Sequence, residues 1–135
     1  MLGGCDHFPQ DPDNTLAEIR EHRAFRVGVD SSLPPEASQL LVRIERATGA
    51  KAQISRGGVE PLLAKLEARE IDMVVAPFGN KTPWAAQVAL SPPVRVEGEG
   101  KNALEWRAAM RPGENRWIML IETNARRASS APGAT

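Results

Sequence analysis

Hydrophobic residues in the first two thirds of the chain follow two periodicities. Residues 26–30 and 71–76 form short apolar runs rich in valine, and residues 51–56 alternate apolar with polar side chains. Both patterns are typical of β-strands. Between them, residues 35–48 and 59–66 carry apolar side chains at helical spacing. Strands that alternate with helices predict right-handed crossovers and a parallel sheet of order 2-1-3.

The flanking segments carry fewer signals. Thr15 and Glu18 have the spacing of a capping box, in which each side chain bonds a free N–H group, so a helix is expected over residues 16–23. Residues 103–110 are interpreted as a returning strand, and residues 112–127 as a final helix. The fold class predicted is therefore α/β, a three-layer sandwich with a mainly parallel sheet and one antiparallel strand.

Length and composition fit a single folded domain. The chain has 135 residues, of which 41% are hydrophobic and 25% charged, and one core of this size is typical of globular domains. We expect a leader and tether over residues 1–14, one α/β domain over residues 15–127 and a disordered tail over residues 128–135.

The charge balance and the few cysteine and histidine residues exclude several classes of function. Seventeen basic and seventeen acidic residues cancel, so the sequence predicts no nucleic-acid partner. A single cysteine excludes an internal disulfide, and with only two histidines no metal site is expected. We expect no cofactor and no enzymatic activity, because no acid and base pair or activated nucleophile stands out.

The start of the chain carries a candidate localisation signal. Leu2-Gly3-Gly4-Cys5 resembles the end of a bacterial lipoprotein signal, in which small residues precede a cysteine that becomes lipidated. The resemblance implies lipidation of Cys5 and a periplasmic or cell-envelope location, with the membrane reached only through this anchor. Residues 7–14 are rich in Pro and Asp, as a tether would be. A free thiol in an unstructured leader is the alternative.

Several short motifs occur in an order that is found in one family. The motifs are Val27-Gly28-Val29-Asp30, Pro34-Pro35, Ala47-Thr48-Gly49, then Leu62, Leu63, Leu66, Ile71, Asp72, Val74, Val75, Thr82, Pro83 and Val88-Ala89-Leu90-Ser91. Together they resemble the first lobe of bacterial extracellular solute-binding proteins of family 3, the periplasmic components of ABC transporters. The resemblance implies a substrate-binding protein with an ABC permease as a possible partner.

The chain departs from that family in two ways. The polar segment that carries Thr82, Pro83 and Trp84 is called the elbow. After it, only residues 94–102 precede the expected return strand, whereas family members insert a second lobe at this point. The chain is therefore expected to keep one lobe. Four positions that contact amino-acid ligands in the family also differ, and in this sequence they are Leu33, Glu36, Gln39 and Ala85, with Ala85 in place of an arginine that clamps the ligand carboxylate.

Ligands of parallel sheets bind beyond the carboxyl ends of the strands, so three loops are candidates for holding a small solute. The predicted ligand-binding residues are Asp30, Ser31, Ser32, Arg56, Gly57, Gly58, Phe78, Asn80, Lys81, Thr82 and Trp84. Helix starts near Pro35 and Gly58 could hold an anionic group. Asp72 lies at the opposite end of its strand and is interpreted as structural. The alternative function is a non-catalytic protein-interaction or self-associating module, with a homodimer formed through the exposed sheet edge.

Overall fold

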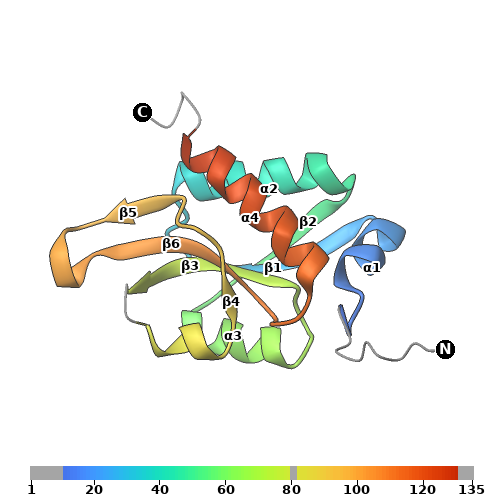
Figure 1. The fold of residues 1–135 in the computed structure, drawn as a ribbon, viewed down its shortest axis with the longest axis horizontal. Helices are drawn as coiled ribbons and strands as arrows, with labels where there is room; N and C mark the ends of the chain where they lie inside the picture. Colours follow the sequence, from blue (N-terminus) through green and yellow to red (C-terminus); the bar gives the residue numbers. More distant parts are fainter. Residues whose placement is uncertain (1–10, 80–81, 131–135) are drawn as a thin grey trace, which may run out of the picture.

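A computed structural model describes residues 11–79 and 82–130. Its centre is a six-stranded sheet of order β2-β1-β3-β6-β4, with β5 paired to β6 (Figure 1). Within the described ranges, no helix is long and apolar enough to cross a membrane. Asn80 and Lys81, two of the predicted ligand-binding residues, fall outside the described residues, as does Cys5.

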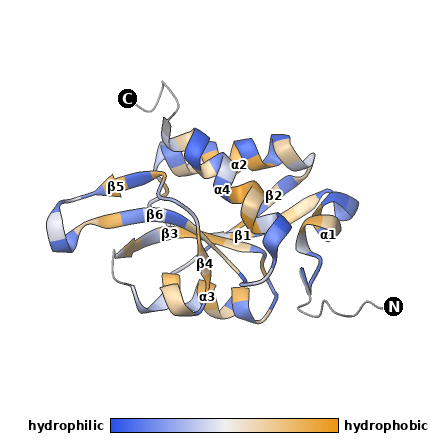
Figure 2. Ribbon diagram, in the orientation of Figure 1, coloured by the Kyte–Doolittle hydropathy of each residue, from blue (hydrophilic) through white to orange (hydrophobic). Residues whose placement is uncertain are grey.

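The parallel part of the sheet confirms the predicted order. β1 (Ala24–Val29) lies between β2 (Lys51–Arg56) and β3 (Met73–Gly79), and both pairs are parallel. The apolar strands are the central ones because their side chains are covered on both faces, and Figure 2 shows hydrophobic residues along β1 and β3. β2, which alternates in sequence, is the edge strand.

Four helices complete the three layers. α1 (Thr15–His22), α2 (Pro35–Thr48) and α4 (Asn115–Ser130) pack on one face, and α3 (Val59–Glu67) packs on the other with the short 3₁₀ helix η2 (Pro83–Ala86). α2 ends where expected, because Gly49 takes the left-handed conformation at φ 72°. The predicted α/β three-layer sandwich is confirmed.

The returning strand is present and pairs with two short strands that were not predicted. β6 (Leu104–Met110) runs antiparallel to β3, as expected. β4 (Ala89–Leu90) and β5 (Arg95–Glu97) pair with successive parts of β6, and the 3₁₀ turn η3 (Gly100–Asn102) closes the hairpin. Residues 94–102 thus form part of a β-hairpin, as their length suggested.

Both tryptophans outside the elbow are core residues. Trp106 and Trp117 are each 1% exposed. The ring of Trp117 meets Phe25 edge to face at 5.9 Å, and its indole N–H donates to the carbonyl of Asp72 at 3.0 Å. Trp117 thus joins α4 to the sheet in two ways, because its ring buries apolar surface and its indole N–H has a hydrogen-bond acceptor.

The capping box predicted at the first helix is wrong. The N-cap is Asn14, which has no capping side-chain bond, and Glu18 contacts His22 instead of the helix start. The Thr15 hydroxyl donates to Glu114 at 2.7 Å. A buried carboxylate is a stronger acceptor for this hydroxyl than any local group, so the long-range contact prevails over the local one.

The folded region extends past the boundaries expected from sequence. The Asp11 N–H donates to the Gly113 carbonyl at 2.9 Å, and Asp13 accepts bonds from Arg69 and Arg111. At the other end, α4 continues to Ser130. Residues 11–14 are therefore bonded to the domain, although the tether was expected to include them.

Candidate functional site

The carboxyl ends of the three parallel strands bring the predicted loops together. β1, β2 and β3 end at Val29, Arg56 and Gly79. The Asp30 N–H donates to the Val75 carbonyl at 3.1 Å, and the Gly57 N–H donates to the Val29 carbonyl at 3.2 Å. These bonds tie the loops after β1 and β2 to neighbouring strands. The structure thus places residues 30–32, 56–58 and the end of β3 at one edge, which we call the carboxyl edge.

Asp30 organises the first of these loops. Its Oδ1 accepts bonds from the Ser32 N–H at 3.1 Å and from the Ser32 hydroxyl at 2.9 Å, which is the geometry of an Asx turn. Its Oδ2 has no bonding partner in the described part of the chain. Ser31 and Ser32 are exposed, and Asp30 is half-buried. The loop therefore presents one acceptor oxygen and two serines to solvent.

The second loop and the two helix starts carry the positive charge of this edge. Arg56 is exposed and has no ion pair with any described residue. α2 and α3 begin after Pro34 and Gly58, and neither helix has a side-chain cap. Uncapped N–H groups and the helix dipoles favour a negative group here.

The elbow residues are largely engaged within the protein. Phe78, one of the predicted ligand-binding residues, is 3% exposed and packs in the core beneath α3, so its ring is not open to a solute. Trp84 is half-buried against the same cluster. The Thr82 hydroxyl accepts a bond from the Trp84 N–H at 3.3 Å and caps η2. Of these residues, Trp84 and Thr82 keep partial solvent access.

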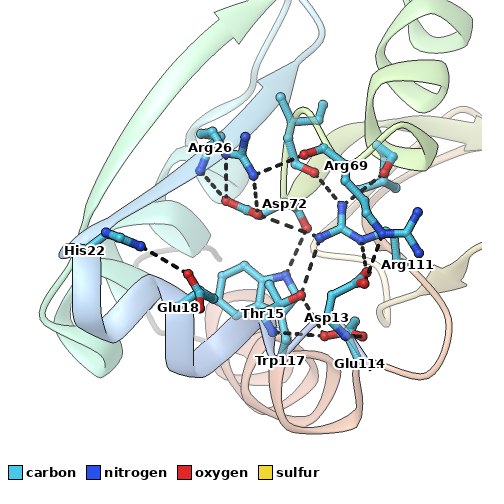
Figure 3. A network of polar contacts seen from close by, with 12 residues as sticks. Asp13, Thr15, Glu18, His22, Arg26, Arg69, Asp72, Arg111, Glu114 and Trp117 are labelled. Atoms are coloured by element: carbon cyan, nitrogen blue, oxygen red, sulfur yellow. Dashed lines mark hydrogen bonds and ion pairs between the residues drawn. The ribbon is translucent and has the colours of Figure 1, made fainter. Parts of the chain in front are cut away.

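A dense polar network lies at the opposite edge, where the parallel strands begin (Figure 3). We call it the amino edge. Arg111 is its centre: Nη1 donates to the carbonyls of Leu66 at 3.0 Å and Ile71 at 2.7 Å, and Nε donates to Asp13 at 3.0 Å. Asp72 accepts bonds from the N–H and guanidinium of Arg26 at 2.8 and 3.1 Å, which agrees with its predicted structural role.

Glu114 and Asp13 complete the network. Glu114 is 1% exposed, and its two oxygens accept bonds from the N–H groups of Asp13 and Thr15 and from the Thr15 hydroxyl. Burial alone would raise the pKa of Asp13, but hydrogen bonds and charges from Arg69 and Arg111 outweigh it and hold that pKa below its usual value. The network fixes the start of α1 to the loop before α4.

The amino edge also holds a cleft of about 700 Å³. Its lining includes Arg26 and Gln53 of the sheet, Glu18 and His22 of α1, and Arg69. Most of the charged groups here already have protein partners, as Figure 3 shows for Arg26, Arg69 and Glu18. A solute would therefore compete with existing bonds.

Three neighbouring residues of α1 beside this cleft have side chains that can ligate a metal ion. Glu18, Glu21 and His22 each offer a ligand atom, and these atoms lie within 4.8 Å of one another. All three are exposed on a single helix, and Glu18 already contacts His22 at 3.1 Å. This arrangement lacks the buried, oriented ligands of a built metal centre.

Comparisons with solved structures agree on the fold. Domain 1 of the arginine-binding protein of T. maritima, in its arginine-bound form, is 20% identical with a TM-score of 0.69, and the match covers 82% of this chain and 97% of that chain. An ancestral cationic amino acid solute-binding protein is 10% identical with a TM-score of 0.73, covering 89% of this chain and 96% of that chain. This chain has the fold of one lobe of a periplasmic binding protein.

Both of these structures are described as amino-acid-binding proteins, and the likeness of this chain to them is one of fold. The same ancestral protein is also described as a precursor of cyclohexadienyl dehydratase. No protein-family model matches the sequence, and a search of curated proteins gives no match.

The structure describes all four positions that the family resemblance singles out as ligand contacts. Ala85 and Gln39 are exposed, and Leu33 is half-buried against the main core. Glu36 accepts a bond from Arg95 of β5 at 3.2 Å. The lobe has the scaffold of this fold, and the departure of the four side chains from the family's ligand contacts stays a prediction from the sequence.

Proposed function

We propose that this domain is a non-catalytic, single-lobe substrate-binding protein of the cell envelope, related to the solute-binding components of ABC transporters. It binds a small solute with an anionic group at the carboxyl edge. The observation that carries the proposal is the likeness to domain 1 of the T. maritima arginine-binding protein, which is described alone in an arginine-bound form. One lobe of this fold is therefore sufficient to hold a ligand in that protein.

The solute class follows from the free groups at the carboxyl edge. Arg56 has no ion pair in the described ranges, and the uncapped starts of α2 and α3 add N–H donors. An anionic group of the solute would accept bonds from these donors. The free oxygen of Asp30 and the hydroxyls of Ser31 and Ser32 would contact its polar remainder. Because Ala85 stands in place of the carboxylate clamp, we expect the anion to lie closer to Arg56 than to the elbow.

Calorimetry with a panel of small carboxylates, phosphate esters and amino acids tests this function. We expect saturable binding of at least one anionic solute. Arg56→Ala should weaken its affinity about tenfold, the scale of one charge-assisted hydrogen bond. The matched control is Arg20→Ala, which removes an exposed arginine of α1 and should leave the affinity unchanged. No binding across the panel, or equal losses in both variants, would contradict the proposal.

Localisation and partners are proposed on the sequence and the fold together. Lipidation of Cys5 would hold the domain at the membrane, and an ABC permease would receive the solute. Labelling of the full-length protein with a radioactive fatty acid, compared with Cys5→Ser, tests the anchor. Label in the parent protein and none in the variant is the expected result.

The second candidate function, an interaction or self-associating module, is favoured by the β5–β6 hairpin. Figure 1 shows this hairpin extending beyond the rest of the sheet, and Val96 and Leu104 on it are 53% and 41% exposed. In a two-lobe relative, this region would continue into the second lobe. Sedimentation at several concentrations tests it: a dimer that Val96→Ser and Leu104→Ser dissociate would support this candidate, and a monomer throughout would exclude the dimer.

A further inference from the structure

The outer side of β2 is an open sheet edge. The Lys51 N–H donates to Arg23 and the Gly57 N–H donates to Val29, so odd-numbered residues of β2 point their backbone groups toward β1. Successive residues of a strand point to opposite sides. The N–H and carbonyl groups of Ile54 and Arg56 therefore point away from the sheet, where no described residue bonds them.

The other side of the sheet is not open in the same way. There, β4 has only two residues, and the chain continues through Pro92 and Pro93 before it reaches β5. Proline lacks the N–H donor that a further strand would need, and short interrupted strands are a common protection of sheet edges. β2, with six regular residues, has no such interruption.

Glu45 closes only one end of the β2 edge. Its carboxylate accepts a bond from the outward N–H of Ala52 at 2.9 Å, reaching across from α2. The donors of Ile54 and Arg56 remain available beyond it. The edge is thus partly protected at Ala52 and open over residues 54–56.

The side chains of β2 indicate what could pair there. Ile54 is 49% exposed, which is high for a large apolar residue. Lys51 and Arg56 are exposed, neither has an ion pair within the described ranges, and the strand has no acidic residue. The edge therefore combines one apolar contact with positive charge at each end.

We propose that the β2 edge binds an extended acidic segment of a partner protein, which adds as a further antiparallel strand. In this register, an apolar residue of the partner lies opposite Ile54, and acidic residues lie opposite Lys51 and Arg56. Opposite charges across neighbouring strands stabilise the pair. A second copy of this chain fits poorly, because pairing β2 with itself brings two lysines and two arginines onto one ribbon without an acidic side chain.

The probe is the blocked peptide Glu-Thr-Val-Thr-Thr-Glu, which places its valine opposite Ile54 and its glutamates opposite Arg56 and Lys51. Amide chemical shifts of the labelled protein should change along β2 in a saturable way. A peptide with lysine in place of both glutamates should bind at least about fivefold more weakly, given two reversed cross-strand charge pairs.

Two variants are expected to reduce binding of the peptide and one to increase it. Ile54→Pro removes an outward N–H without breaking a bond to β1, so the fold is retained and binding is lost. Lys51→Glu should weaken binding about threefold. Glu45→Ala frees the Ala52 N–H for the partner strand and should strengthen binding about threefold. Arg56 is left unchanged because it also belongs to the candidate solute site.

The outcomes separate this proposal from its rivals. Shift changes on β2 that Ile54→Pro abolishes and Glu45→Ala enhances would support it. No binding at millimolar peptide, equal binding of the lysine peptide, or shift changes away from β2 would overturn it. So would a dimer that Ile54→Pro dissociates, because the occupant of the edge would then be a second copy.

Discussion

The two ends of the parallel strands use their polar groups differently. At the amino edge, Arg111, Asp13 and Glu114 are buried or half-buried and bonded to one another's segments. At the carboxyl edge, Arg56 and one oxygen of Asp30 have no partner among the described residues. Paired buried groups hold a fold together, whereas exposed unpaired groups are free to bind a ligand. We infer that the amino edge stabilises the fold, whereas the carboxyl edge is available for the binding proposed above.

The largest expected effect is that of Arg111→Ala. The change removes one of the two arginine donors of the Asp13 carboxylate and the Nη1 donor of the Leu66 and Ile71 carbonyls, so we expect a loss of about 3–5 kcal/mol in the free energy of unfolding. Urea unfolding followed by circular dichroism measures it. Arg116→Ala is the control, since its contact with Asp11 is long at 3.9 Å and exposed. Equal effects of the two changes would remove the distinction between buried and exposed arginines.

Glu114→Gln should have the next largest effect. Both oxygens of Glu114 accept bonds, and a glutamine keeps one acceptor while it turns an N–H group toward another donor. We expect a loss of about 1.5–3 kcal/mol, the scale of a hydrogen bond to a charged group. The comparison is with Glu122→Gln on α4, whose half-buried side chain has no partner among the described residues, so this change should shift the urea midpoint little. An unaltered midpoint in Glu114→Gln would contradict the role of this carboxylate.

The pH dependence of stability should depend on Asp13. Its pKa is lower in the folded than in the unfolded state, so the folded state binds fewer protons. The stabilisation is full above the unfolded value of about 4 and is lost as the pH falls through the folded pKa. Urea midpoints measured from pH 6 down to pH 2.5 should fall less steeply in Asp13→Asn than in the parent. Ser31→Ala, which removes no ionisable group, should retain the parent slope. An unchanged slope in Asp13→Asn would contradict the role of this carboxylate.

The smallest effects on stability are expected at the carboxyl edge. Ser31→Ala and Arg56→Ala remove exposed side chains without described partners, so the free energy of unfolding should change by no more than about 0.5 kcal/mol. The same urea experiment measures this. A larger loss in either variant would mean that this edge, too, is needed for folding.

Local patterns were sufficient to predict much of the scaffold. Strands β1, β2 and β3 follow from valine runs and alternation, and the end of α2 follows from Gly49. These signals act within a few residues, so the sequence contains them directly. The position of the carboxyl-edge loops followed in turn, because parallel strands end on one side.

The amino-edge network could not be predicted in this way. The bonds from Asp13 and Thr15 to Glu114 join residues about one hundred positions apart, and no local motif marks them. The capping box at Thr15 failed for the same reason. Phe78 could have been placed more accurately, since it alternates with Val74 and Ala76 and these side chains all face α3.

The hydrogen bonds that join Asp11, Asp13 and Thr15 to residues 111–116 also affect the order in which the domain folds during synthesis. During synthesis, α1 emerges about one hundred residues before Arg111 and Glu114. Contacts this distant in sequence slow folding, because a long loop must close before they form. The nascent chain can therefore pack its first helix on β1 and α2 early, but the polar contacts of that helix form only after residues 111–116 follow.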